Sequence, residues 1–115
     1  MKRNTIKPIL PSLREKKRYI TYKVSSDKRI NEDRLKTAIN SYIMRFLGEL
    51  LYARAGIIFL DNNSKNGIIR TTNNYVNELK AALALIDNIE NNPVAIDSVC
   101  VSGLLNKARS KMEVN

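Results

Sequence analysis

The chain has 115 residues, of which 43% are apolar, and a formal net charge of +9 at pH 7, which is typical of one folded domain with a single modest core. It has no histidine and only one cysteine, Cys100, so a histidine-based catalytic site, a thiolate zinc site and an internal disulfide are all excluded. No apolar run approaches the roughly 18 residues of a membrane span, and the basic N-terminus lacks the apolar segment of a signal peptide, so we expect a cytoplasmic protein without membrane contact.

The first 23 residues hold most of the charge. Eight basic side chains and one acid, Glu15, give this segment a net charge of +7, whereas residues 24–103 carry nine basic and nine acidic side chains. Two prolines and the lack of hydrophobic periodicity predict that residues 1–17 form an extended basic arm before a single domain at 18–115. Concentrated like charge opposes compaction and indicates a polyanionic partner. We therefore predict RNA contacts by Arg14, Lys16, Lys17 and Arg18; a solvated arm without a partner is the alternative.

The first half of the domain is predicted to be strand, helix, strand. Apolar and polar residues alternate over 18–24, which predicts a strand with one buried face. Asn31 then has the position of a helix N-cap, and apolar residues recur at three- and four-residue steps over 35–47, as in an amphipathic helix. Gly48 is placed either to end this helix or to kink it. Residues 57–60 form a short apolar run typical of a second strand.

The second half repeats this alternation. Residues 61–67 are turn-forming by composition, so 68–72 should form a third strand in a hairpin with the second. The later elements are expected to be a helix capped by Asn73 or Asn74 with a buried stripe over 76–86, a fourth strand at 94–101 after Pro93, and a short basic helix at 104–112. This order specifies a ferredoxin-like or RRM-like α/β sandwich, βαββαβ, with a four-stranded antiparallel sheet, both main helices on one face and an additional C-terminal helix.

Aromatic stacking of bases in the manner of RRM domains is not favoured by these strands. The third strand has no aromatic residue, and Tyr19 and Tyr22 of the first strand lie on opposite faces, which favours phosphate contacts with a structured RNA. If Ile69 faces the helices, Arg70 lies on the open face of the sheet, where it either binds RNA or is only solvated. The last helix offers three further predicted RNA contacts, which would equally complement a helix C-terminus: Lys107, Arg109 and Lys111.

The predicted first helix is more apolar near its end than one buried stripe requires. The apolar residues concerned are Phe46, Leu47, Leu50, Leu51 and Tyr52. One interpretation is that they pack in the core. The other is that they form an exposed surface which binds a partner protein or a second copy of this chain.

Several segments resemble the archaeal ribonuclease P protein component 2 family, and together they span about residues 8–112. They are Leu-Pro-Ser-Leu-Arg at 10–14, Lys-Arg-Tyr-Ile at 17–20, Phe-Leu-Gly-Glu-Leu at 46–50, Gly-Ile-Ile-Arg at 67–70, the run at 75–86, and Val-Ser-Gly at 101–103. Their order and spacing are more specific than any one of them. The chain departs from the family pattern at Ser12, where a second proline is expected. The loop at 62–66 and the residues after Lys111 carry no recognisable family signal.

The resemblance implies an RRM-like sandwich that serves as a non-catalytic, RNA-binding subunit of ribonuclease P, the ribonucleoprotein that removes the 5′ leader from precursor tRNA. In that family the RNA performs catalysis with magnesium, so no cofactor and no catalytic residue are expected on this chain. The implied partners are the ribonuclease P RNA, ribonuclease P protein component 3, precursor tRNA indirectly, and a second copy of the chain within a heterotetramer. Two alternatives stay open: a ribosomal or other structural-RNA-binding protein with the same fold plan, and a ferredoxin-like enzyme or ligand-sensing module.

Overall fold

The computed structural model describes residues 16–113, and its elements follow the predicted order with one additional strand. The elements are β1 (Lys17–Ser26), α1 (Glu32–Ala55), β2 (Ile58–Leu60), β3 (Asn66–Thr72), the 3₁₀ turn η2 (Asn73–Tyr75), α2 (Val76–Ala84), β4 (Asn88–Ile89), β5 (Asn92–Ser102) and α3 (Leu105–Glu113). The α/β fold predicted from the sequence is therefore confirmed. Most of the predicted arm lies outside the described residues, and the last residue assigned to it, Lys17, is the first residue of β1.

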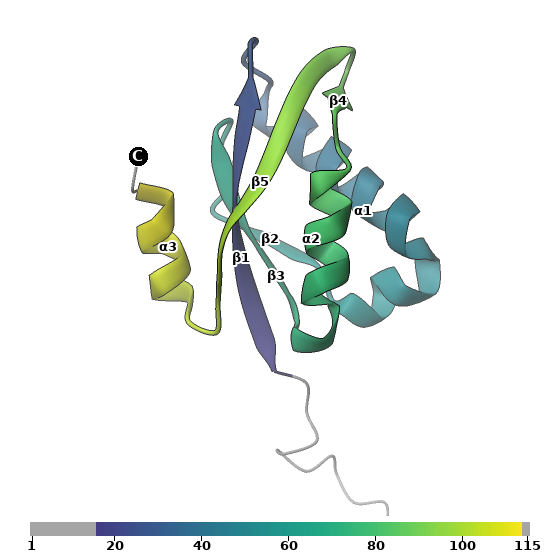
Figure 1. Cartoon of the computed structure of the whole chain (residues 1–115), viewed down its shortest axis with the longest axis vertical. Helices are drawn as coiled ribbons and strands as arrows, with labels where there is room; N and C mark the ends of the chain where they lie inside the picture. The colour runs from purple at the N-terminus through teal and green to yellow at the C-terminus, as the bar shows by residue number, and fades with distance from the viewer. Residues whose placement is uncertain (1–15, 114–115) are drawn as a thin grey trace, which may run out of the picture.

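The strands form one antiparallel sheet in the order β2-β3-β1-β5-β4. Helices α1 and α2 lie on one side of this sheet and α3 lies on the other (Figure 1). The sheet has five strands rather than the expected four because β4 adds a two-residue strand beside the start of β5. Glu90 and Asn91, which connect β4 to β5, both have positive φ, at 53° and 67°. This is the backbone of a two-residue type I′ hairpin turn.

The core lies between the sheet and the pair of helices α1 and α2. Ile69 belongs to this core, so β3 turns Ile69 toward the helices and the residues next to it toward the other face. Burial of large aliphatic side chains is the main force that holds such layers together. The fully buried members of the core include Ile20, Tyr22, Leu35, Ile39, Ile43, Leu79, Leu83 and Ile86.

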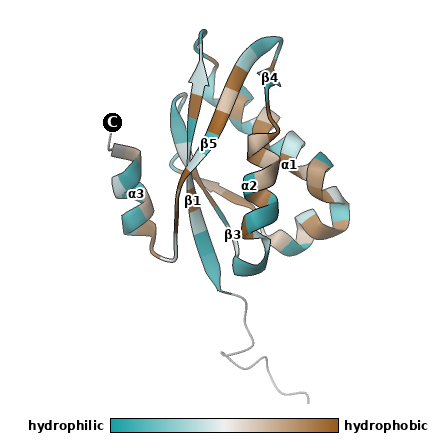
Figure 2. Ribbon diagram, viewed as in Figure 1, coloured by the Kyte–Doolittle hydropathy of each residue, from teal (hydrophilic) through white to brown (hydrophobic). Residues whose placement is uncertain are grey.

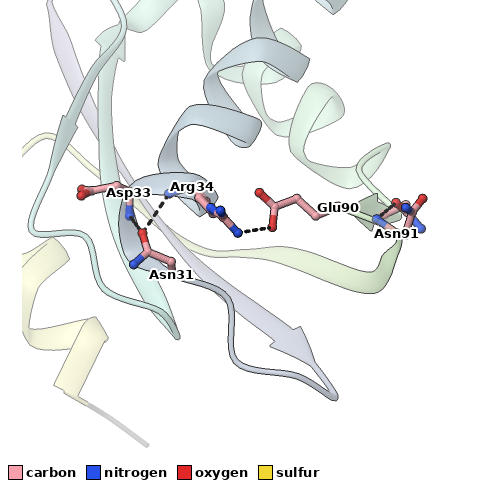
Figure 3. Close-up of polar contacts among 6 residues, drawn as sticks. Asn31, Asp33, Arg34, Glu90 and Asn91 are labelled. Atoms are coloured by element: carbon pink, nitrogen blue, oxygen red, sulfur yellow. Dashed lines mark hydrogen bonds and ion pairs between the residues drawn. The ribbon is translucent and has the colours of Figure 1, made fainter.

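The start of α1 is fixed by its N-cap and by an ion pair to the β4–β5 turn. The side-chain oxygen of Asn31 accepts hydrogen bonds from the backbone N–H groups of Asp33 and Arg34, at 2.9 and 3.3 Å, as predicted for an N-cap. Arg34 then pairs with Glu90 at 3.5 Å (Figure 3). These contacts hold the first turn of the helix beside the hairpin.

Gly48 interrupts α1. Its backbone dihedrals, φ 82° and ψ 162°, are not helical, and they lie in a region open almost only to glycine. Beyond the break the helix continues to Ala55, whose carbonyl accepts a 2.8 Å hydrogen bond from the hydroxyl of Thr71 in β3. The kink that was one of the two predicted roles of Gly48 is therefore present, and the last part of α1 is anchored to the sheet.

The predicted cap of the second helix is wrong by one to two residues. Neither Asn73 nor Asn74 is its N-cap; both belong to η2, and α2 starts after Tyr75, which makes no side-chain capping bond. The reason is that the chain leaves β3 directly through a 3₁₀ turn, which shifts the helix start along the chain. The helix also ends at Ala84, although Ile86 beyond it is buried as expected.

Helix α3 covers part of the sheet face that the sequence suggested would be open. The buried hydroxyl of Thr21 in β1 donates a 3.0 Å hydrogen bond to the carbonyl of Ala108. Further along the helix, the side-chain amide of Asn66 donates to the carbonyl of Met112 at 3.1 Å. In Figure 1 β1 extends beyond this helix at both ends, so α3 covers only the middle of this face and leaves the N-terminal end of β1 uncovered.

Candidate nucleic-acid interface

The N-terminal end of β1 carries the first group of predicted RNA-binding residues. Lys16 and Lys17 are exposed, and no described carboxylate forms an ion pair with either of them or with Arg18. The guanidinium group of Arg18 donates to the carbonyl of Lys17 at 3.0 Å. This end of β1 is hydrophilic in Figure 2. Arg14, the fourth member of the predicted group, lies outside the described residues.

Close approach of Arg18 to the chain between β5 and α3 depends on a glycine. A Cβ atom placed on Gly103 would lie 3.3 Å from Nη1 of Arg18, which is tighter than an ordinary contact. The absence of a side chain at Gly103 therefore lets the guanidinium group lie beside the β5–α3 connection. We name Lys16, Lys17 and Arg18 together the basic end.

Arg70 points to the sheet face opposite the core. Its neighbour Ile69 faces α1 and α2, and the strand register places Arg70 directly between Tyr19 of β1 and Ile58 of β2 on the same face. The side chain of Arg70 is partly buried. Its Nε atom and the hydroxyl of Thr72 are both buried without a hydrogen-bond partner among residues 16–113. The structure thus brings Arg70 to the face expected for it, but that face is partly covered by α3.

The three predicted cations of α3 are all exposed, yet they differ in their contacts. Arg109 forms an ion pair with Asp61, which follows β2. Lys107 and Lys111 have no ion pair with any described carboxylate. They are four residues apart and therefore lie on the same side of the helix. Lys107 and Lys111 thus remain available to an anion, while Arg109 holds α3 to the loop after β2.

A second cationic region was not predicted from the sequence. A groove of about 1090 Å³ opens at the other end of β1, between the β1–α1 connection, the β2–β3 loop and the start of β5. We name it the loop groove. Its charged lining residues are Lys23, Lys28, Arg29 and Lys65, with two acids, Asp27 and Glu32. The signal for it is weak in the sequence because these residues come from separate segments: Lys23 ends the basic N-terminal stretch, and the others lie in the electrically neutral part of the chain.

The apolar residues near the end of α1 divide into two groups. Leu47 is only 7% exposed and belongs to the core, and Leu51 and Tyr52 pack against that core. Phe46 and Leu50, by contrast, are 46% and 64% exposed. Of the five residues considered for a protein interface, the structure therefore places two on the surface. We name Phe46 and Leu50 the α1 apolar pair.

Metal-ligand clusters and perturbed ionisable groups are the chemical features to consider among residues 16–113. No three side chains of the types His, Cys, Asp or Glu gather there in a way that could hold a metal ion. One buried ionisable group is strongly perturbed: burial raises the pKa of the Tyr22 phenol well above its usual value. Tyr22 lies in the core, and its hydroxyl donates a 3.4 Å hydrogen bond to the side-chain oxygen of Asn62. Over the same residues, no helix is long and apolar enough to cross a membrane.

Comparison with known proteins gives one family. The model of the Rpp14/Pop5 family matches residues 18–113. The Ribonuclease P protein component 2 of Pyrococcus furiosus is 38% identical over 107 residues, which cover 91% of this chain and 89% of that protein. The protein of the same name from Methanocaldococcus jannaschii is 32% identical, covering 92% of this chain and 79% of that one.

A solved structure shares the fold at much lower sequence similarity. A chain in the cryo-EM structure of yeast Ribonuclease MRP superimposes with a TM-score of 0.63 over 86% of this chain and 87% of that one. The two sequences are 11% identical. This likeness therefore supports the arrangement of strands and helices described above and nothing finer.

Proposed function

Because the chain belongs to the Rpp14/Pop5 family, we propose that it is a protein subunit of ribonuclease P and that it binds the RNA of that enzyme without performing catalysis. The observation that carries this proposal is the group of unpaired cations at the basic end. Lys16, Lys17 and Arg18 stand together, and no described carboxylate neutralises them. Cations left unpaired in this way favour a polyanionic partner.

The proposed mechanism is electrostatic. A folded catalytic RNA brings phosphates close together, and their repulsion opposes the fold. Lysine and arginine side chains that replace condensed counterions relieve this repulsion and gain free energy from counterion release. Magnesium would act on the RNA subunit, so the effect of this chain would be to reduce the magnesium concentration that the RNA requires. In this mechanism the basic end, Arg70, Lys107 and Lys111 contact phosphates.

A protein partner is proposed for the α1 apolar pair. Exposed large apolar side chains that gather on one surface commonly mark a protein interface, and Phe46 and Leu50 stand on either side of the Gly48 break in α1. Protein component 3 is the partner that the family resemblance implies, and a second copy of this chain is the alternative. Phe46 and Leu50 would enter that interface, while Leu47 supports it from the core.

The decisive experiment is reconstitution of precursor-tRNA cleavage from the cognate RNA and protein component 3, with and without this chain, at low magnesium. We expect cleavage to depend strongly on the chain. Replacement of Arg14, Lys16, Lys17 and Arg18 by alanine should raise the magnesium concentration needed for half-maximal cleavage. The matched control also loses four charges, by alanine at four exposed basic residues of α1 and α2: Lys36, Arg45, Arg54 and Lys80.

Two outcomes would contradict the proposal. Equal cleavage at every magnesium concentration with and without the chain would remove its role in the enzyme. Tighter binding to ribosomal RNA than to the ribonuclease P RNA would support the structural-RNA alternative instead.

A further inference from the structure

We propose that the loop groove is a second RNA-binding site, which holds the phosphodiester backbone at the end of the sheet opposite the basic end. The inference rests on the proposed function, because it assumes that RNA is the polyanion this chain binds. It adds a site that neither the sequence nor the family comparison assigns.

The groove is built from three segments that are distant in sequence. It is lined by the last part of β1, by a loop wall at 63–66, and by the β1–α1 connection with the start of β5. At about 1090 Å³ it exceeds the roughly 300–1,000 Å³ typical of small-molecule pockets. A groove of this volume that is open to solvent can hold a segment of a polymer.

The loop wall is held in place by its asparagines. The side-chain oxygen of Asn63 accepts hydrogen bonds from the backbone N–H groups of Lys65 and Asn66, at 2.8 and 2.9 Å. The carbonyl of Lys65 accepts a 2.7 Å hydrogen bond from the backbone of Val24 in β1. This arrangement fixes the backbone of Lys65 against β1, next to Lys23. The loop that carries no family signal thus has a definite structural role, which is to set a lysine at the rim of the groove.

The unpaired positive charge of the groove favours binding of an anion. Its four basic side chains are exposed, and none of them forms an ion pair or hydrogen bond with another described side chain. Asp27 and Glu32 neutralise only part of this charge, so the lining keeps a positive excess. Like charges held together without counter-charges destabilise a fold, and an anionic ligand removes that cost. Ser25, Ser64 and Asn63 add neutral hydrogen-bonding groups to the lining.

The composition of the lining favours RNA over an acidic protein segment. The fully buried centres of protein interfaces are enriched in aromatic residues, Met and Arg and depleted in Lys. The groove is lined by no aromatic residue and no Met, but by three lysines. Phosphate contacts need only cations and hydrogen-bond donors, which this lining supplies.

The test compares matched charge-removing variants in binding to the cognate ribonuclease P RNA. The groove variant carries Lys28→Gln and Lys65→Gln, and its control carries Arg54→Gln and Lys80→Gln, which changes the net charge equally. Affinity is measured as a function of KCl concentration. Each lost phosphate contact should lower the slope of log affinity against log salt by about 0.7–0.9. We therefore expect a decrease of about 1.6 for the groove variant and none for the control.

A mapping experiment locates the contact independently of affinity. In a Cys100→Ser background, iron–EDTA is attached to Ser25→Cys at the groove or to Leu85→Cys at the exposed end of α2. We expect cleavage of the RNA from the groove position and not from the α2 position.

If the groove variant keeps the wild-type slope while a basic-end variant, Lys16→Gln with Lys17→Gln, lowers it, the groove is not an RNA site although the proposed function stands. If wild-type protein fails to bind this RNA, the proposed function itself is wrong. Loss of binding to protein component 3 alone would assign the groove to a protein instead and overturn the inference.

Discussion

Tyr22 is the largest fully buried side chain of the core, and its phenol makes the stability of the fold pH-dependent. Burial raises its pKa well above the ordinary value of 10, because the phenolate is poorly solvated there. The unfolded chain therefore releases this proton at a lower pH than the folded chain. Stability from the neutral phenol is fully present below pH 10 and is lost as pH rises from there toward the folded pKa.

We expect the free energy of unfolding to fall above pH 10 by up to about 1.4 kcal/mol per pH unit from this residue alone. Tyr22→Phe removes the titrating group and should flatten that part of the profile. Urea unfolding at pH 8 to 11 measures the difference, with Tyr75→Phe as a control at the partly exposed edge of the core. Parallel pH profiles for wild type and Tyr22→Phe would show that the phenol does not govern alkaline stability.

The packing of Tyr22 leaves no space for a side chain at Gly67. A Cβ atom at Gly67 would lie 2.7 Å from Cζ and 2.5 Å from the hydroxyl oxygen of Tyr22. Since the ring is enclosed by the core, it cannot move aside freely, and overpacking of this kind costs about 1–3 kcal/mol. Gly67→Ala should therefore lower the urea midpoint markedly. Combination with Tyr22→Leu should recover part of the loss caused by the alanine, and purely additive effects of the two substitutions would contradict the clash.

At the scale of elements, the break in α1 determines which of its apolar residues meet the core. The residues before Gly48 pack along the sheet, and those after it form a separate short segment whose last residue, Ala55, is fully buried. A Cβ atom on Gly48 would meet no atom within 4 Å. The cost of a substitution there is therefore one of backbone strain and not of space.

Gly48→Ala should destabilise the fold by about 1–3 kcal/mol, the usual cost of holding an alanine at such dihedrals. Glu49→Ala, one residue further along and exposed, should change stability by less than about 0.5 kcal/mol. Thermal and urea unfolding of the two variants test this. Equal stability of Gly48→Ala and wild type would mean that α1 becomes one continuous helix at no cost.

The apolar residues around this break differ in exposure, and substitutions can distinguish the exposed Phe46 and Leu50 from the buried Leu47. Phe46→Glu with Leu50→Glu should abolish association with protein component 3, or self-association, while the folded monomer is kept. Leu47→Glu should instead unfold the chain, because it would bury an unpaired charge. Light scattering and circular dichroism report the two effects. Leu85→Glu, at another exposed apolar position, is the control, and equal loss of association in that variant would remove the case for the α1 apolar pair.

For the molecule as a whole, periodicity was sufficient to predict the layers. The spacing of apolar residues in β1 and α1, the cap at Asn31 and the turn after β2 are local features, and each appeared where it was expected. The two-residue strand β4 was missed because it is too short to show alternation. The position of α3 was also missed, since the hydrogen bond from Thr21 to Ala108 joins residues 87 apart.

The candidate site was predictable only where charge is contiguous along the chain. Lys16, Lys17 and Arg18 stand out as candidates because they are neighbours in sequence. The loop groove was missed because Lys23 and Lys65 belong to different strands and loops, and the segment 24–103 is neutral when its charges are only counted. Folding brings cations of that segment together with Lys23 at the groove, where Asp27 and Glu32 neutralise only part of the charge. Another acid of the segment, Glu90, pairs with Arg34 away from the groove.

The distance between the two cationic regions leads to a prediction about the whole molecule. Lys17 and Ser26 are the first and last residues of β1, and a rise of about 3.3 Å per residue separates them by roughly 30 Å. Sites this far apart without shared contacts contribute additively to a binding free energy. The reductions in log affinity for the ribonuclease P RNA caused by Lys16→Gln with Lys17→Gln, and by Lys28→Gln with Lys65→Gln, should therefore sum in the fourfold variant. Additive losses would mean that one RNA binds both ends of the sheet at the same time. A fourfold variant that binds no more weakly than either double variant would show that the two regions do not bind the RNA simultaneously.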